Sequence, residues 1–236
     1  MAIYNFESNL SDIKATEKLI EFGKIDTDYV SLPKMLLKLT DINLHTFSWA
    51  MCNNVCYEIF QSDSAVIQEI NGIYTVYYNE NKPDTHNRFS IAHEWGHYEL
   101  GHDFDAGCKN MYLYRMQEIA TNRFAAQLLM PMHVIKEFEN RGIEITPSFI
   151  QRTFYVSEEA AGIRFKNFEK YCPELLSKKE KQLNDILINE IFSDFIKRVC
   201  DKERSVLFDC KNRYEYQRLQ HKEVIKIERW KNRNFQ

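Results

Sequence analysis

Two histidines four residues apart constrain this chain more than any other feature. They lie in the segment His93-Glu94-Trp95-Gly96-His97. In a helix, side chains four residues apart lie one above the other, so both imidazoles face the same point in space. The flanking residues are largely apolar and predict a helix from about Arg88 to Gly101. Polar motif residues in such a helix would be costly without a shared ligand.

Paired imidazoles suit a tetrahedral zinc ion. Glu94 projects beside them, where its carboxylate can take a proton from a metal-bound water and return it to a leaving amine. The pattern therefore predicts a zinc-dependent peptidase with His93 and His97 as ligands and Glu94 as the general acid/base. The alternative is an exposed helix with two unrelated histidines, against which the apolar flanks argue.

A catalytic zinc usually has three protein ligands and one open position. Glu118 is the favoured third ligand, because it lies at the start of a second apolar helix, predicted over about Tyr112 to Met130. Asn122, one turn later, could hydrogen-bond a zinc-bound imidazole and fix its orientation. The other candidates for the third position are His86, His102 and His133.

Stabilising a developing oxyanion needs a donor near the zinc-bound carbonyl. His102 is the first candidate, and the sequence also offers Tyr98, Tyr112, Tyr114 and Arg123 without separating them. A second zinc site at Cys172, Cys200, Cys210 and His221 is disfavoured, because these residues lack paired C-x2-C spacing.

The fold is expected to be α+β and predominantly helical, with a small antiparallel sheet. Residues 11–23, with Ser11 as a cap, predict one helix, and a second begins at Leu32-Pro33. Residues 42–78 are rich in β-branched and aromatic runs. Asn71-Gly72 between two such runs predicts a tight hairpin whose last strand is Ile73 to Asn79.

The second half predicts mostly helices. Ser157 is expected to cap one of several short helices, and residues 177–198 predict a long amphipathic helix. The last segment alternates in part and suggests strands, at Val206, Phe208 and 224–227. The expected division is a peptidase domain over 1–135, a helical region over 136–171 and a C-terminal region of unassigned function over 172–236.

Composition excludes several classes of protein. Apolar residues make up 44% and charged residues 28% of the 236, which indicates a soluble folded chain. Residues 172–236 hold 15 Lys and Arg against 11 Asp and Glu, but these charges are interspersed and indicate a solvated face rather than a nucleic-acid site. With no secretory signal and no apolar run of membrane-spanning length, we expect a cytoplasmic protein with reduced cysteines.

Two blocks of the sequence resemble the ImmA/IrrE metallopeptidase family. Residues 87–97 are similar to its RFxxAHExGH pattern, and residues 118–131 to its ExxANxFAAxLLMP pattern. This chain has Trp95 where the family commonly has leucine and Thr121 where it commonly has alanine. Neither departure touches a ligand. The resemblance covers roughly residues 10–170.

The resemblance implies that His93, His97 and Glu118 bind zinc and that Glu94 is the catalytic residue. It also implies that a peptide docks along the strand ending in Asn79, and that residues 154–165 form a helix-turn-helix-like piece. Family members characteristically cut helix-turn-helix repressors, often encoded on mobile elements, and relieve repression under stress. The implied partner is therefore a repressor protein.

Two alternatives stay open. The chain could be a non-proteolytic regulatory module that binds DNA or a repressor through residues 144–170 and the tail, or a component of a toxin–antitoxin system. An intact Glu94 favours the peptidase, because a pure binding module has no evident use for this carboxylate.

Overall fold

The computed structural model describes residues 2–25, 27–55, 62–102, 110–206 and 208, with side chains from residue 10 onward. Two compact units divide the chain at Ile196, Met1–Ile196 and Lys197–Gln236. The three-part division expected from the sequence stays a prediction. Within the described ranges, no helix is long and apolar enough to cross a bilayer.

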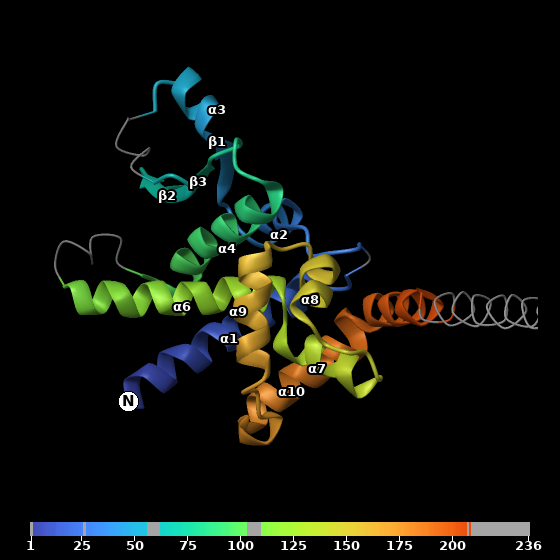
Figure 1. The fold of residues 1–236 in the computed structure, drawn as a ribbon. Helices are drawn as coiled ribbons and strands as arrows, with labels where there is room; N and C mark the ends of the chain where they lie inside the picture. Colours follow the sequence, from blue (N-terminus) through green and yellow to red (C-terminus); the bar gives the residue numbers. More distant parts are fainter. Residues whose placement is uncertain (1, 26, 56–61, 103–109, 207, 209–236) are drawn as a thin grey trace, which may run out of the picture. The chain divides into compact units, whose positions relative to one another are not determined.

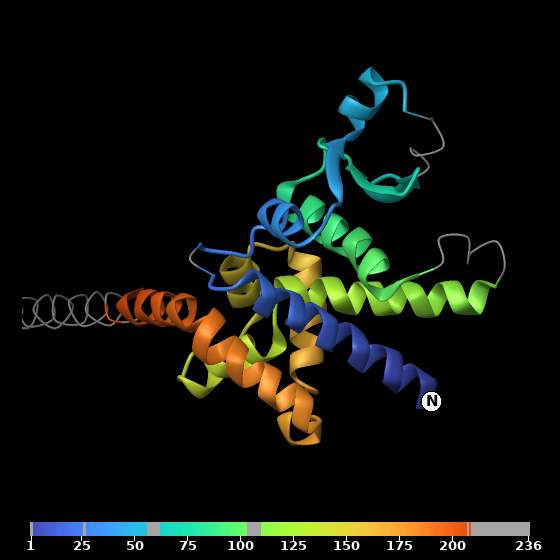
Figure 2. The ribbon, with the colours of Figure 1, turned by 180° about the vertical axis from the view of Figure 1, so that it is seen from behind.

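The helix α6 (Met111–Leu129) forms the centre of the first unit. Helices α1 (Ala2–Phe22) and α4 (Asp84–Leu100) both pack along it, as Figures 1 and 2 show from opposite sides. The α4–α6 contact is close at Gly96, where an added Cβ would lie 3.1 Å from Cδ1 of Phe124. This approach is what allows side chains of α4 and α6 to converge on one point.

A three-stranded sheet covers one side of α4. The strands are β1 (Asn43–Thr46), β2 (Ala65–Ile70) and β3 (Ile73–Tyr78), in the order β1-β3-β2. The predicted hairpin joins β2 and β3, which are antiparallel, and its turn residues Asn71 and Gly72 have positive φ angles of 54° and 79°. The sheet is mixed rather than wholly antiparallel, since β1 pairs parallel to β3.

The family resemblance implies the wrong strand as the sheet edge for peptide docking. It was assigned to the strand ending in Asn79, but β3 lies in the middle of the sheet with both edges paired. The strand with an open edge beside α4 is β2. Sequence patterns do not order strands, so they predicted the hairpin but not which of its strands lies at the edge of the sheet.

Two local expectations in the N-terminal part also differ from the structure. Helix α1 begins well before Ser11, which is therefore a buried helical residue and not a cap. Residues Phe47–Cys52, expected as strand, form helix α3, because the Thr46 side chain accepts a hydrogen bond from the backbone N–H of Trp49 and caps it. The expected helix at Leu32-Pro33 is confirmed as α2 (Leu32–Leu39). The predicted strand over 55–60 lies almost wholly outside the described residues.

Short helices make up the rest of the first unit. Ser157 caps α9 as predicted, by accepting from the N–H of Ala160. The long helix expected over 177–198 is interrupted, because a wider turn at Leu187–Ile191 shifts the apolar stripe before helical residues resume at 193. The elements are α7 (Met132–Asn140), α8 (Pro147–Phe154), α9 (Glu158–Phe168), η2 (Pro173–Leu175), α10 (Lys178–Ile186) and η3 (Leu187–Ile191).

In the second unit, residues 197–206 and 208 are helical. The strands suggested at Val206 and Phe208 are therefore wrong: the partial alternation there is too short to outweigh the helix that leads into it. The segment 224–227 lies outside the described residues.

Arg88 ties α4 to the junction of α8 and α9. Its guanidinium is buried and donates to the carbonyl oxygens of Val30, Phe154 and Tyr155 at 2.7, 3.3 and 3.1 Å. It also lies 4.4 Å from the ring centroid of Tyr29. Burial lowers the pKa of Arg88 to about 10, so it stays charged at neutral pH. These contacts fix the start of the motif helix.

Candidate metal centre

Helices α4 and α6 bring three side chains together. Nε2 of His93 lies 3.2 Å from Nε2 of His97, and each of these nitrogens lies 3.3 Å from a different carboxylate oxygen of Glu118. Among the described residues, these three form a group of histidine and carboxylate atoms close enough to hold a metal ion. The cluster is thus able to bind a metal.

The spacing of the candidate ligand atoms is of the size that a zinc ion requires. A tetrahedral site with bonds of about 2.0–2.1 Å has ligand atoms about 3.3 Å apart. The two Nε2 atoms are 3.2 Å apart, and each lies 3.3 Å from its own oxygen of Glu118. Two nitrogens and one carboxylate oxygen are also a donor set that zinc uses in catalytic sites.

The Nδ1 atom of each imidazole contacts a polar atom of a neighbouring side chain. Nδ1 of His93 lies 3.1 Å from Oδ1 of Asn122, which can only accept, so His93 carries its proton on Nδ1 and turns a lone pair on Nε2 to the centre. Nδ1 of His97 lies 3.1 Å from Nδ1 of His102. With His97 donating in that contact, both histidines present lone pairs to the Glu118 carboxylate, an arrangement that a cation stabilises.

Glu94 lies beside the centre and is anchored to the sheet. Its Oε2 accepts a 3.0 Å hydrogen bond from the backbone N–H of Ile67 in β2. Burial raises the pKa of Glu94 above its ordinary value, and the charges of His93 and His97 only partly offset this effect. A carboxylate with a raised pKa is better suited to hold a proton near neutral pH.

The environment of Glu118 shifts its pKa in the direction opposite to that of Glu94. Its hydrogen bonds with His93 and His97 keep its pKa well below the ordinary value. Burial together with the neighbouring His97 lowers the pKa of His102 to about 4, so His102 is neutral and its Nδ1 can accept a hydrogen bond from Nδ1–H of His97. The environment of Glu118 therefore favours its ionised form, whereas the environment of Glu94 favours its protonated form.

Comparison with protein families identifies this arrangement. A family model described as the IrrE N-terminal-like domain matches residues 55–166, which include the whole cluster. Residues 55–166, just under half of the chain, therefore match a domain of the ImmA/IrrE metallopeptidase family. No curated protein shows a significant match to the chain. The resemblance drawn from the two sequence blocks is confirmed, and so is the predominantly helical α+β fold with its small sheet.

The ImmA/IrrE domain has an open cleft at the cluster, with a volume of about 490 Å³. Its walls come from β2, α4 and α6. Besides the cluster and Glu94, they include Ser64, Ala65, Ile67, Phe89 and Tyr114. Tyr114 lies one turn before Glu118 on α6, and the nearby charge of Glu118 raises its pKa. The domain thus has room for a peptide next to the candidate ligands.

The other histidines proposed as third ligands lie apart from the cluster. His86 contacts Oγ of Ser64 through Nε2 at 2.9 Å, and His133 contacts the hydroxyl of Tyr171. His102 touches the back of His97 instead of the centre.

The remaining donors considered for the oxyanion also lie elsewhere. Tyr98 packs edge-on against Tyr74, and Arg123 pairs with Asp12. Tyr112 is exposed and does not line the cleft.

Two contributors to the site were missed by sequence reasoning. The backbone N–H of Ile67 has no signature in sequence, since any residue except proline supplies it. Phe89 forms part of the cleft wall from α4. Its position four residues before His93 could have placed it on the same helix face.

Proposed function

We propose that the protein is a zinc-dependent endopeptidase with His93, His97 and Glu118 as ligands and Glu94 as the general acid/base. The single observation that carries this proposal is the convergence of two histidine nitrogens, 3.2 Å apart, on the Glu118 carboxylate, whose two oxygens each lie 3.3 Å from one of them. Membership of a metallopeptidase family supports the same chemistry. Zinc, when bound, supplies a Lewis acid that polarises a carbonyl and makes water acidic.

Residues of the chain have separate roles in the proposed reaction. Asn122 and His102 keep the two imidazoles oriented, so that their Nε2 atoms stay free for the ion. Glu94, held by the N–H of Ile67, takes a proton from the attacking water and returns it to the leaving amine. Its raised pKa makes the second of these transfers accessible near neutral pH.

Tyr114 is the residue we assign to stabilise the developing oxyanion. Of the five donors considered from sequence, it is the one that lines the cleft, and it lies close enough to Glu118 for the charge of that carboxylate to raise its pKa. Its position on α6 next to Glu118 lets the hydroxyl approach a carbonyl bound in the cleft. Such a donor typically contributes about 10²–10³ in kcat.

The open edge of β2 is the docking strand in this proposal. Residues Ala65, Val66 and Ile67 line the cleft, and among the strands that the structure describes, β2 has a partner on one edge alone. An extended peptide can add to such an edge through main-chain hydrogen bonds. This mode brings a peptide bond close to Glu94 without requiring a particular sequence next to the cut.

The substrate we propose is a helix-turn-helix repressor, which rests on the family resemblance and gives the enzyme a regulatory role in the cytoplasm. The test is incubation of the zinc-loaded protein with the repressor encoded beside its own gene, followed by mass spectrometry of the products. One or a few defined cuts are expected. They should stop when a chelator is added and resume with added zinc. An intact repressor together with cleavage of other proteins would refute the substrate while sparing the chemistry.

A further inference from the structure

A second cavity lies beside the metal centre. It is a groove of about 830 Å³ between α6 and α9, within the range of 300–1,000 Å³ typical of ligand sites. We call it the α6/α9 groove. Its walls include Ile119, Asn122 and Ala126 from α6 and Ala160, Ile163 and Asn167 from α9. None of these residues has a part in the chemistry proposed above except Asn122.

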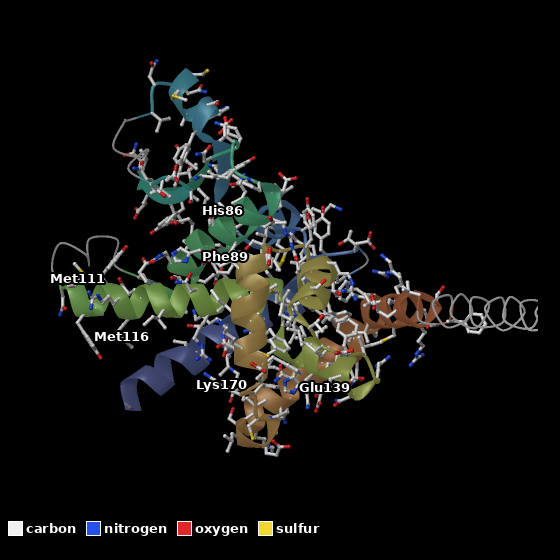
Figure 3. All side chains as sticks on the ribbon, in the orientation of Figure 1. His86, Phe89, Met111, Met116, Glu139 and Lys170 are labelled. Carbon is white, nitrogen blue, oxygen red and sulfur yellow. The ribbon has the colours of Figure 1, made fainter. Side chains whose placement is uncertain are left out.

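The groove adjoins the active-site cleft. Phe89 of α4 lines both cavities. Asn122 lines the groove and holds the candidate ligand His93 at 3.1 Å. Figure 3 shows Phe89 and Lys170, both lining residues, near opposite ends of α9. The groove therefore begins next to the cleft and extends along α9.

The charged residues that line the groove balance in sign. Arg123 pairs with Asp12. Arg164 is buried and donates to the carbonyl oxygen of Met130 at 2.8 Å and to Oε1 of Gln127 at 2.6 Å. The lining has no excess of either sign, so net charge does not decide what binds; its charged members are Asp12, Glu159, Glu180, Arg123, Arg164 and Lys170.

Apolar side chains are exposed along the groove instead. Ile119, Ile163 and Leu175 are 38%, 55% and 84% exposed, and they come from α6, α9 and η2. Exposed apolar residues gathered along one cavity mark an interaction site. Burying such side chains against a partner removes apolar surface from water and so stabilises a complex. The chemistry of the wall thus favours an apolar partner.

We infer that the α6/α9 groove binds the protein substrate on one side of the scissile bond and selects apolar side chains there. This inference rests on the proposed peptidase function. Helix α9 has 11 residues and is therefore about 16 Å long. At about 3.3 Å per residue, an extended chain along it contributes about five residues. The groove supplies the sequence selectivity that main-chain pairing with β2 does not.

Cleavage profiling of a proteome-derived peptide library tests this inference. The zinc-loaded wild type, Ile163→Glu and Leu175→Glu are compared, and the products are sequenced by mass spectrometry. The matched control is Leu37→Glu, since Leu37 on α2 is 86% exposed and does not line the groove. Zinc content and thermal unfolding are measured for each protein to show that the fold and the ion are retained.

Wild type and Leu37→Glu should prefer apolar residues at several positions on one side of the cut. Ile163→Glu should lose this preference at middle positions and cut apolar-flanked peptides at least about tenfold less efficiently. Leu175→Glu should lose it only at the outermost position. Identical profiles for all four proteins would overturn the groove assignment and leave the peptidase standing. A wild type that binds zinc but cuts nothing would overturn both.

Self-association is the competing use of this surface. A wild-type dimer that Ile163→Glu converts to a monomer, with the cleavage profile unchanged, would assign the groove to a second copy of the chain and refute substrate binding. Size-exclusion chromatography with light scattering on the same proteins separates these outcomes.

Discussion

The backbone N–H of Ile67 donates a 3.0 Å hydrogen bond to Oε2 of Glu94 and so joins the edge strand β2 to the motif helix α4. The contact links the element proposed to bind a peptide with the residue proposed to move its proton. It also leaves the second carboxylate oxygen of Glu94 available to the cleft. The sheet therefore has a direct part in the site.

Replacing Ile67 by proline tests this link. Proline removes the N–H donor, and an edge strand tolerates it where the N–H points away from the ladder. Hydrogen bonds to charged groups are worth about 1.5–3 kcal/mol, so kcat/KM should fall about tenfold or more. Ile67→Ala is the matched control, since it loses the side chain and keeps the donor. Equal activity of the two variants in steady-state assays would show that the contact has no catalytic part.

Asn122 is expected to act through His93. Asn122→Ala removes the acceptor for Nδ1 of His93, and loss of such a partner typically lowers metal affinity about 10–100-fold. Competition with a zinc chelator measures this affinity. Arg115→Ala, an exposed change on the same helix, should leave zinc affinity at the wild-type value. Wild-type affinity in Asn122→Ala would mean that the imidazole is oriented by packing alone.

Two glycines should respond in opposite directions to alanine. At Gly96 the new Cβ would lie 3.1 Å from the ring of Phe124, and overpacking of this kind costs about 1–3 kcal/mol of unfolding free energy. At Gly162 on α9 no atom lies within 4 Å, so alanine should add about 0.5–1 kcal/mol through helix propensity. Urea denaturation midpoints measure both. Stabilisation by Gly96→Ala would contradict the close α4–α6 packing.

His133 should make stability depend on pH. Burial lowers its folded-state pKa below the ordinary value of 6.5, although the charges of Asp185, Glu137 and Glu180 partly oppose this. The unfolded chain therefore takes up this proton first as pH falls. Stability is lost as pH drops through about 6.5 toward the folded-state pKa. His133→Gln should lose less unfolding free energy than wild type between pH 7 and pH 5. An equal or larger loss of unfolding free energy in His133→Gln would contradict a lowered pKa of His133 in the folded state.

Local signals in the sequence were sufficient to predict which side chains of α4 and α6 converge. The spacing of His93 and His97 and the place of Glu118 on the face of the next helix depend on helix periodicity, which is a property of neighbouring residues. Asn122 followed from the same periodicity, one turn beyond Glu118. The contacts of these side chains agree with the geometry expected, and their roles stay predictions for the assays described above.

Long-range and backbone features could not be predicted in this way. The parallel pairing of β1 with β3 joins residues about 30 positions apart, and no local pattern specifies it. The Ile67 contact uses a backbone group that every strand residue has. The wider turn at Leu187–Ile191 depends on how that helix packs against its neighbours. Tertiary packing decides such features, and the sequence periodicity does not contain them.

The most direct test of the account is a comparison of wild type with Glu94→Gln, measuring zinc content and peptide cleavage on the same samples. Glutamine keeps the size of the side chain and can still accept from the N–H of Ile67, but it cannot take up a proton. Both proteins should bind one zinc ion, and the variant should lose cleavage by about 10²–10⁴-fold. Cleavage by Glu94→Gln at the wild-type rate would contradict the central claim.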